Sequence, residues 1–479
     1  MKLLNYINGQ MVEPISQKWM DNTDPSTNTV FSQIPDSDER DVQVAVDAAK
    51  QAFVGWSTMP VKKRSDLLLR IAALIEKNLQ RFAEAESLDN GKPVWLAKQV
   101  DIPRASANFH FYATAALHLA AETHDMENTA INYTLRQPIG IAGCISPWNL
   151  PLYLFTWKIA PALASGNCVV AKPSEITPVT AFLLSQFCIE AGLPAGVLNI
   201  IHGTGPRVGS AIVSHPDIPV ISFTGGTKTG AEISRIAAPM FKKLSLELGG
   251  KNPNIIFDDC DFDHAVATSI KSSFSNQGEI CLCGSRIFIQ RSIYDEFKEA
   301  FVSKIKGLKT GDPKDETNFL GAIVSQPHFE KILSYIDLAR EEGGVILTGG
   351  KAIQPGGRCK DGFFIEPTVF ENLPYTCRTN QEEIFGPVVT LTPFDTEEEV
   401  LMMANSTPYG LAATVWTTNL TKAHRVAAAL HSGIVWINCW LLRDLRTPFG
   451  GVKQSGIGRE GGFEALKFFT EEKNICIKL

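Results

Sequence analysis

The chain has 479 residues, of which 44% are hydrophobic and 20% are charged, and its formal net charge at pH 7 is −6. A chain of this length and apolar content is not disordered and exceeds one ordinary core, so we expect two or three globular domains. The weakly acidic balance argues against a polybasic surface for nucleic acid or for a membrane, which leaves a small molecule as the expected partner.

The N-terminal residues MKLLNYINGQ lack the apolar stretch of a secretory signal. No apolar run elsewhere approaches the roughly 18 residues that a membrane span needs. The 10 cysteines are dispersed and form no CxxC motif. We therefore expect a cytoplasmic protein with reduced thiols, which binds neither nucleic acid nor a membrane.

Secondary structure is predicted from the spacing of apolar residues. Residues 40–122 have largely helical patterns, and five later runs, GIAGCIS, NCVVAK, VLNII, PVISF and NPNIIF, are typical of buried strands. A helix is predicted from Pro178 to Ala191, where a glycine and then a proline follow. This alternation predicts a parallel sheet, and a similar run from SRIFIQ through TVWTTN to SGIVWIN predicts a second α/β domain beyond about residue 250.

Two glycine-rich turns follow predicted strands. GTGPRVG contains Gly205 and Gly209, and FTGGTKTG contains Gly225 and Gly226. Glycines in such turns let backbone N–H groups approach a pyrophosphate at a helix N-terminus. Neither turn matches the pattern G-x-G-x-x-G, so tight turns without a ligand are the alternative.

The motif KPSE follows the predicted strand NCVVA and contains Lys172 and Glu175. Open α/β sheets bind ligands at the carboxyl ends of their strands. A carboxylate there can accept hydrogen bonds from both ribose hydroxyls of an adenosine, and a lysine can donate to one of them. A solvated ion pair in a loop is the alternative, but together with the glycine-rich turns this pair predicts a dinucleotide site.

Two cysteines, Cys281 and Cys283, lie close together in NQGEICLCGSR. No histidine or third cysteine is near enough in sequence to complete a metal site, so no metal is predicted, and a disulfide between them is disfavoured in a reducing compartment. Burial as a small apolar side chain is the usual role of a cysteine. Cys281 is the exception, because it follows a glycine and a glutamate and is expected in a turn that leaves room for a substrate.

A nucleophilic thiol needs a base and a donor to the oxyanion. Glu247, at the end of the predicted strand in SLELGGK, is a candidate base. Asn149 in SPWNLP is a candidate donor, because its neutral amide can donate to a developing alkoxide.

The motifs SPWNLP, KPSE, FTGG, LELGGK, NQGEICLCGSR, EEIFGPV and TPFGGVKQSGIGRE occur in the order found in NAD(P)-dependent aldehyde dehydrogenases, and the chain resembles this family over essentially its whole length. The resemblance implies that Cys281 is the nucleophile, Glu247 the general base and Asn149 the donor to the oxyanion, whereas Cys283 has no chemical role. It implies NAD as the cofactor. The residues implied to contact it are Ser146, Trp148, Lys172, Ser174, Glu175, Gly205, Gly209, Phe223, Gly225, Gly226, Leu248, Glu383 and Phe385.

The resemblance also implies an α/β fold with three parts. These are a Rossmann-like cofactor domain of residues 1–118 and 137–248, an α/β catalytic domain of residues 249–455, and a small β oligomerisation element of residues 119–136 and 456–479. The C-terminal strand is expected to extend the sheet of a neighbouring subunit. A homo-oligomer, either a dimer or a homotetramer, is therefore expected.

The segment NCWLLRDLRTPFGG carries Arg443 where general aldehyde dehydrogenases have an aromatic or apolar residue. An arginine in an apolar tunnel is costly unless it meets an anion, so a substrate with a distal carboxylate is expected. Pairing with Asp444 or exposure to solvent is the alternative. The segment also resembles the branch of the family that oxidises 2-aminomuconic and 2-hydroxymuconic semialdehydes. That branch has a second arginine where this chain has His110, and Arg446 is a candidate substitute.

Three further residues are predicted to contact the substrate, namely Trp157, Ser275 and Phe449. Ser275 replaces an aromatic residue that is common in the family, which predicts a roomier and more polar pocket. Gly226 stands where many relatives have a serine that contacts the pyrophosphate.

The implied reaction oxidises an aldehyde to a carboxylic acid through a thiohemiacetal and a thioester on Cys281. A non-enzymatic relative would lack the thiol, the base or the amide, and an enzyme that passes its thioester to coenzyme A would lack Glu247. The remaining alternative is an aldehyde dehydrogenase for uncharged aliphatic, aromatic or betaine-type aldehydes.

Overall fold

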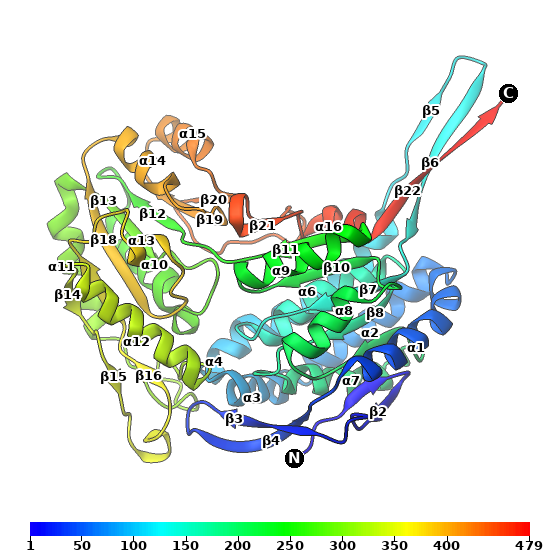
Figure 1. Cartoon of the computed structure of the whole chain (residues 1–479). Coiled ribbons are helices and arrows are strands. Elements are labelled where there is room, and N and C mark those ends of the chain that lie inside the picture. Colours follow the sequence, from blue (N-terminus) through cyan, green and yellow to red (C-terminus); the bar gives the residue numbers. More distant parts are fainter.

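Two open α/β sheets organise the computed structural model, which describes residues 1–479 (Figure 1). The first is an 8-stranded sheet with the order β2-β1-β9-β8-β7-β10-β11-β21, in which the strands from β9 to β11 run parallel. Its strands are β1 (Asn5–Ile7), β2 (Gln10–Val12), β7 (Ile141–Ile145), β8 (Cys168–Lys172), β9 (Leu198–Ile200), β10 (Val220–Thr224), β11 (Lys243–Glu247) and β21 (Gly456–Ile457).

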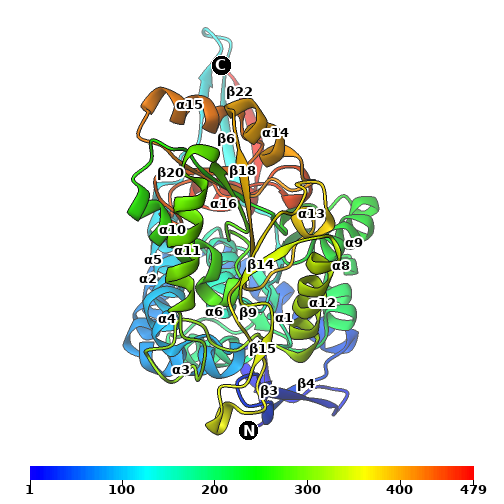
Figure 2. The same cartoon turned by 90° about the vertical axis from the view of Figure 1, so that its left-hand side faces the viewer.

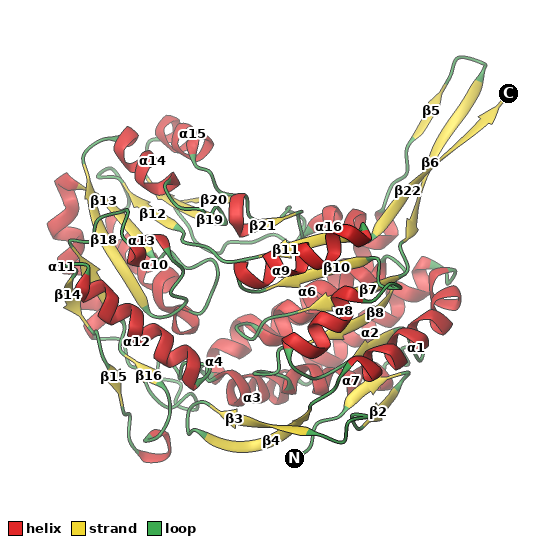
Figure 3. Cartoon of the chain, viewed as in Figure 1, coloured by secondary structure: helices red, strands yellow, loops and turns green.

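Helices cover both faces of this sheet, so its central strands are apolar at nearly every position (Figure 3). The five predicted strands and the largely helical segment 40–122 are confirmed, but NPNIIF, which was grouped with the other four strands, forms β12 (Pro253–Ile256) of the second sheet. The predicted helix at 178–191 is α7, and it ends just before Gly192, which has a φ of +75°. The helices of this part are α1 (Glu39–Ser57), α2 (Val61–Lys77), α3 (Leu79–Asn90), α4 (Val94–Leu96), α5 (Ile102–Ala115), α6 (Pro151–Ala164), α7 (Val179–Glu190), α8 (Ser210–Ser214) and α9 (Thr227–Ala237).

The second sheet has 7 strands in the order β14-β17-β18-β13-β12-β19-β20, all parallel except β14. The predicted second α/β region is thus confirmed. Its strands are β12 (Pro253–Ile256), β13 (Arg286–Gln290), β14 (Val345–Thr348), β17 (Thr368–Glu371), β18 (Val388–Phe394), β19 (Ala412–Trp416) and β20 (Ile434–Ile437). Its helices are α10 (Phe262–Phe274), α11 (Tyr294–Lys306), α12 (Gln326–Glu341), α13 (Arg378–Gln381), α14 (Glu397–Asn405) and α15 (Leu420–Ala429).

A three-stranded antiparallel arm projects away from both sheets (Figures 1 and 2). It joins the hairpin β5 (Thr123–Asp125) and β6 (Ala130–Pro138) to the C-terminal strand β22 (Thr470–Lys478), which pairs with β6 along its whole length. Helix α16 (Gly462–Phe468) leads into β22. The pairing of β22 with a neighbouring subunit and the three-part division of the chain stay predictions. None of the helices has the length and apolar character that a membrane crossing requires.

Two further β-hairpins are small. One pairs β3 (Trp19–Asp24) with β4 (Thr29–Pro35), and the other pairs β15 (Ala352–Ile353) with β16 (Phe364–Ile365).

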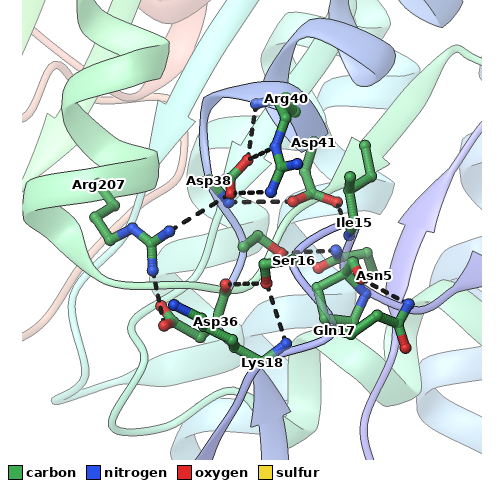
Figure 4. A network of polar contacts seen from close by, with 12 residues as sticks. Asn5, Ile15, Ser16, Gln17, Lys18, Asp36, Asp38, Arg40, Asp41 and Arg207 are labelled. Carbon is green, nitrogen blue, oxygen red and sulfur yellow. Dashed lines mark hydrogen bonds and ion pairs between the residues drawn. The ribbon is translucent and has the colours of Figure 1, made fainter.

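Helix α1 begins with a capping box that also reaches a glycine-rich turn (Figure 4). The side chain of Asp38 accepts from the backbone N–H of Arg40, and Asp41 accepts from the backbone N–H of Asp38 at 3.1 Å. Arg207, in the turn GTGPRVG, pairs with Asp36 at 2.7 Å and lies 3.5 Å from Asp38. These ion pairs connect the residues at the start of α1 to the turn that follows β9.

Candidate active site

The strand order of the first sheet reverses between β7 and β10, because β8 and β9 lie on one side of β7 while β10 and β11 lie on the other. Ligands of open α/β sheets bind outside the carboxyl ends of the strands at such a switch point. Asn149 follows β7, Gly225 and Gly226 follow β10, and Glu247 ends β11. The fold therefore brings four predicted site residues to one edge of the sheet.

The segment that connects the two sheets lies against the loop of Cys281. A Cβ atom at Gly249 would overlap the carboxylate of Glu383, and one at Gly250 would lie 2.9 Å from the carbonyl oxygen of Cys281. Asn252 donates its side-chain amide to the carbonyls of Cys281 at 2.7 Å and of Cys283 at 2.9 Å. The absence of a side chain at Gly249 and Gly250 favours this close approach, which places the end of β11 beside the cysteine loop.

The two neighbouring cysteines differ in their surroundings. Neither forms a disulfide, and Cys283 is buried whereas Cys281 is partly exposed. Cys281 lines one cavity with Trp148 and Glu383 and another with Glu247 and Arg443, and Cys283 lines neither of these two. A thiol at Cys281 can therefore meet two reactants, while Cys283 is a packing residue.

The cavity on the cofactor side of Cys281 has a volume of about 200 Å³. Six predicted cofactor residues line it, namely Trp148, Gly225, Gly226, Leu248, Glu383 and Phe385. Two lining residues on α12, His328 and Lys331, were not predicted. The ring of His328 lies 4.9 Å from that of Trp148, and Lys331 donates to the carbonyl of Glu383 at 3.1 Å.

A second group of predicted cofactor residues surrounds Glu175. Its carboxylate accepts from Lys172 at 2.7 Å and from the backbone N–H of Gly205 at 3.0 Å, and a Cβ at Gly209 would lie 3.9 Å from the side chain of Lys172. Burial raises the pKa of Glu175, but the ion pair with Lys172 and the hydrogen bonds outweigh burial and leave this pKa below its ordinary value. The carboxylate is therefore charged at neutral pH, which fits a ribose.

Three predicted cofactor residues are buried near these groups. The hydroxyl of Ser146 has no hydrogen-bond partner, whereas that of Ser174 accepts from the N–H of Ile176 at 3.2 Å. Phe223 fills the space that a side chain at Gly225 would need. Gly226, by contrast, has open space around its Cα, so the serine of other relatives would fit there.

Glu247 is buried, and neither of its carboxylate oxygens has a hydrogen-bond partner. Burial, and then the nearby carboxylate of Glu460, raise its pKa well above the ordinary value. Glu460 itself pairs with buried Lys158 at 2.8 Å, and the sequence did not point to this pair. In the sequence, Lys158 could have been noticed as a possible buried cation because it interrupts the apolar run LYLFTWKIAPALA. An unpaired carboxyl with a raised pKa suits a general base.

The thiol of Cys281 also has a raised pKa. Burial is the main cause, and the carboxylates of Glu383 and Glu247 add to it, while the cation of Arg443 acts in the opposite direction. The thiol is therefore protonated at neutral pH in this state. A base in the same pocket is needed to form the thiolate, and Glu247 lines that pocket.

Asn149 is buried against the cysteine loop. Its amide nitrogen donates to the carbonyl of Glu279 at 3.0 Å, and its own carbonyl accepts from the side chain of Asn276 at 3.1 Å. Asn276 and Gln277 have left-handed backbones with φ of 52° and 56°. Because an amide carries two N–H donors, one donor of Asn149 remains for a ligand.

The pocket on the other side of Cys281 has aromatic walls and one cation. Arg443 donates to the hydroxyl of Tyr153 at 2.6 Å, and its guanidinium lies 3.9 Å from the ring centre of Phe449 and 5.1 Å from that of Trp157. Asp444 instead pairs with Arg446 at 2.6 Å. The alternative in which Asp444 pairs with Arg443 is therefore wrong. Arg446, the candidate second anchor, is already paired with Asp444.

An outer cavity of about 990 Å³ begins at Arg443 and opens to solvent. His110 and Arg446 line this cavity and not the pocket of Cys281. Arg104, which was not predicted, also lines it and lies 5.6 Å from the ring centre of Tyr153. Its position on α5, six residues before His110, did not predict from the sequence that it would line this cavity. Ser275 lines neither cavity and is only partly buried.

The match to the aldehyde dehydrogenase family model covers residues 11–475, and the chain belongs to this family. It is 52% identical over 480 residues to a 2-aminomuconic semialdehyde dehydrogenase of Danio rerio, covering 99% of this chain and 98% of the relative. It is 46% identical over 484 residues to a 2-hydroxymuconic semialdehyde dehydrogenase of Pseudomonas sp. (strain CF600), covering 100% of both chains. A structure of an aldehyde dehydrogenase from Bacillus cereus in complex with NAD+ superimposes with a TM-score of 0.98 at 39% identity, covering 100% of this chain and 97% of that one. The predicted fold is confirmed.

We predict that Cys281→Ala abolishes aldehyde oxidation while NAD still binds, because this thiol alone borders both cavities. The matched control Cys283→Ser should keep most activity. Steady-state NADH formation and NAD titration measure both effects. The reverse pattern in the two variants would contradict the assignment of the thiol.

Proposed function

We propose that this chain is an NAD-dependent dehydrogenase for a carboxylated semialdehyde, such as 2-aminomuconic or 2-hydroxymuconic semialdehyde, which it oxidises to the carboxylic acid. The observation that carries the substrate class is the guanidinium of Arg443, which lines the pocket of Cys281 and pairs with no carboxylate of the chain. The names of the curated relatives agree with this class.

The residues at the carboxyl edge of the first sheet support NAD as the cofactor. The cavity beside Cys281, the charged pair of Lys172 and Glu175, and the unpartnered hydroxyl of Ser146 suit a dinucleotide. Glu175 would hold the adenosine ribose, and Glu383 and Phe385 would hold the nicotinamide end. NAD, when bound, accepts a hydride from the substrate carbon.

The side chains then have these proposed roles. Glu247 takes the thiol proton, and the sulfur of Cys281 bonds to the aldehyde carbon, whose carbonyl electrons move to the oxygen. The amide of Asn149 and the N–H of Cys281 donate to that oxygen. Loss of hydride re-forms the carbonyl as a thioester. Glu247 releases the thiol proton to solvent and then takes a proton from a water, whose oxygen attacks the thioester carbon. The C–S bond breaks, the proton held by Glu247 passes to the sulfur, and the carboxylic acid leaves with the thiol restored.

Arg443 suits a carboxylate because of how it is held. Tyr153 accepts one of its N–H groups, and the faces of Phe449 and Trp157 surround its guanidinium, so the cation is oriented without being neutralised. Arg443 is only partly buried, and when a substrate covers it a carboxylate compensates the cation through a charge-assisted, bidentate contact. Arg104, on the outer side of Tyr153, supplies a second cation along the path from solvent.

We also propose a homo-oligomer, either a dimer or a homotetramer, formed through the arm. Ile131, Leu135 and Ile477 are exposed on its strands, and the arm has little core of its own to bury them. The free cysteines support a cytoplasmic location, because a reducing compartment keeps thiols unpaired.

We predict a preference for NAD over NADP. A 2′-phosphate about 4 Å from a carboxylate costs roughly 4 kcal/mol at an effective dielectric of about 20, and Lys172 offsets part of this repulsion. A preference of at least about tenfold in kcat/KM should remain, and Glu175→Gln should reduce it. Equal kcat/KM values for the two cofactors in the unaltered chain would refute the prediction.

The substrate class is tested by Arg443→Ala. Loss of a charge-assisted hydrogen bond of roughly 1.5–3 kcal/mol should raise KM for a carboxylated semialdehyde by about 10- to 150-fold, and should spare an uncharged aldehyde of similar length.

Arg446→Ala is the matched control, because it removes the same charge from an exposed ion pair. Its effect should stay below about fivefold on either substrate. If Arg443→Ala weakened charged and neutral substrates equally, Arg443 would be structural and the alternative of an enzyme for uncharged aldehydes would stand.

A further inference from the structure

The turn that follows α3 reaches the loop of Asn149. Gly91 ends α3 in a left-handed conformation with φ of +88°, and a Cβ there would lie 2.7 Å from the carbonyl oxygen of Ala322. This sharp turn directs the residues on either side of it toward the loop after β7. Asn90 donates to the carbonyl of Trp148 at 3.0 Å, and Lys92 donates to the carbonyl of Asn149 at 3.0 Å.

Lys92 is a fully buried cation with two carboxyl groups around it. It pairs with Asp101 at 2.9 Å and lies 3.9 Å from Glu86, and all three side chains have a relative exposure of 0%. Glu86 also accepts from the backbone N–H of Leu152, at the start of α6. Burial raises the pKa of Glu86 to about 8 and also raises that of Asp101, while the cation of Lys92 lowers both; the shorter contact makes Asp101 the partner of Lys92.

Burying such a pair gives little stability, because desolvation costs several kcal/mol per ion. A well-packed apolar group would serve a purely structural purpose at least as well. The pair does, however, direct a charged donor at one particular backbone carbonyl. That carbonyl belongs to Asn149, whose side chain is the proposed donor to the oxyanion.

Asn149 is also held by the cysteine loop. Its carbonyl also accepts from Asn276, and its amide nitrogen contacts the carbonyl of Glu279. The peptide of Asn149 therefore lies between Lys92 and the segment that leads to Cys281. Removal of the Lys92 donor leaves Asn276 as the only side chain that holds this carbonyl.

We propose that Lys92 is a positioning residue for the oxidation, which acts by fixing the backbone of Asn149 so that its amide meets the oxyanion. This inference rests on the proposed function, because it presumes that Asn149 is the oxyanion donor. Oxyanion donors are effective only when they are held within about 0.5 Å of the productive geometry. The pair Lys92–Asp101 supplies that precision from outside the substrate and cofactor pockets.

The test is a double-mutant cycle of Lys92→Met and Asn149→Ala, measured with NAD and a carboxylated semialdehyde. Loss of one oxyanion donor lowers kcat by about 10²–10³-fold, so Asn149→Ala should do so. Lys92→Met should lower kcat by about 10- to 100-fold with little change in KM for NAD, and it should raise the deuterium isotope effect of a 1-deuterated aldehyde. In the Asn149→Ala background, Lys92→Met should cost less than about threefold more, because both changes remove the same interaction.

Two further variants keep the test decisive. Ser106→Ala removes a buried hydroxyl that donates to Ala72 and Glu76, away from Asn149, and it should leave kcat unchanged. If Lys92→Met alone is not recovered as folded protein, Lys92→Met/Asp101→Asn is measured in its place, because it leaves no unpaired buried charge.

The outcomes separate the two proposals. If Asn149→Ala kept full kcat, the oxyanion role in the proposed function would fall, and this inference with it. If Asn149→Ala lost activity but the Lys92 variant lowered kcat by the same factor in both backgrounds, or not at all, only the positioning role of Lys92 would be overturned.

Discussion

The site depends on a close approach of two glycines, Gly249 and Gly250, to the carboxylate of Glu383 and the backbone carbonyl of Cys281. A Cβ at Gly249 would displace the carboxylate of Glu383, and one at Gly250 would press against the backbone carbonyl of Cys281. This contact brings the end of β11, with Glu247, to the cysteine loop. The small size of these two residues lets the connecting segment lie against the cysteine loop, where a thiol, a carboxyl group and two cavities meet.

Burial is the second constraint, because it shapes the acid–base chemistry around that contact. It raises the pKa values of both Cys281 and Glu247, which favours the neutral form of each group in this state. Arg443 lies in the same apolar surroundings without a carboxylate partner. The pocket thus combines an unpaired cation and an unpaired carboxyl group, which suits a substrate that brings an anion at one end and an aldehyde at the other.

Motifs made the fold and the central residues predictable from the sequence. Short motifs that contain Gly, Glu, Asn and Cys indicate local turns and strand ends, and the order of these motifs along the chain resembles aldehyde dehydrogenases and so implies the roles of Cys281, Glu247 and Asn149. The sequence did not reveal His328, Lys331, Arg104 or the pair Lys158–Glu460, because these side chains reach the site from helices or loops distant in the chain. It also could not show that Arg446 is bound to Asp444 or that Ser275 lies outside both cavities, since side-chain direction within a loop depends on tertiary contacts.

The central claim is that oxidation proceeds through an acyl group on Cys281 that Glu247 helps to hydrolyse. Intact-protein and peptide mass spectrometry of Glu247→Gln, mixed with NAD and a carboxylated semialdehyde, tests it most directly. The account predicts that this variant forms NADH in an amount close to that of enzyme and accumulates a thioester on the peptide of Cys281. An unmodified Cys281 after NADH has formed, or an acyl group on Cys283, would contradict it.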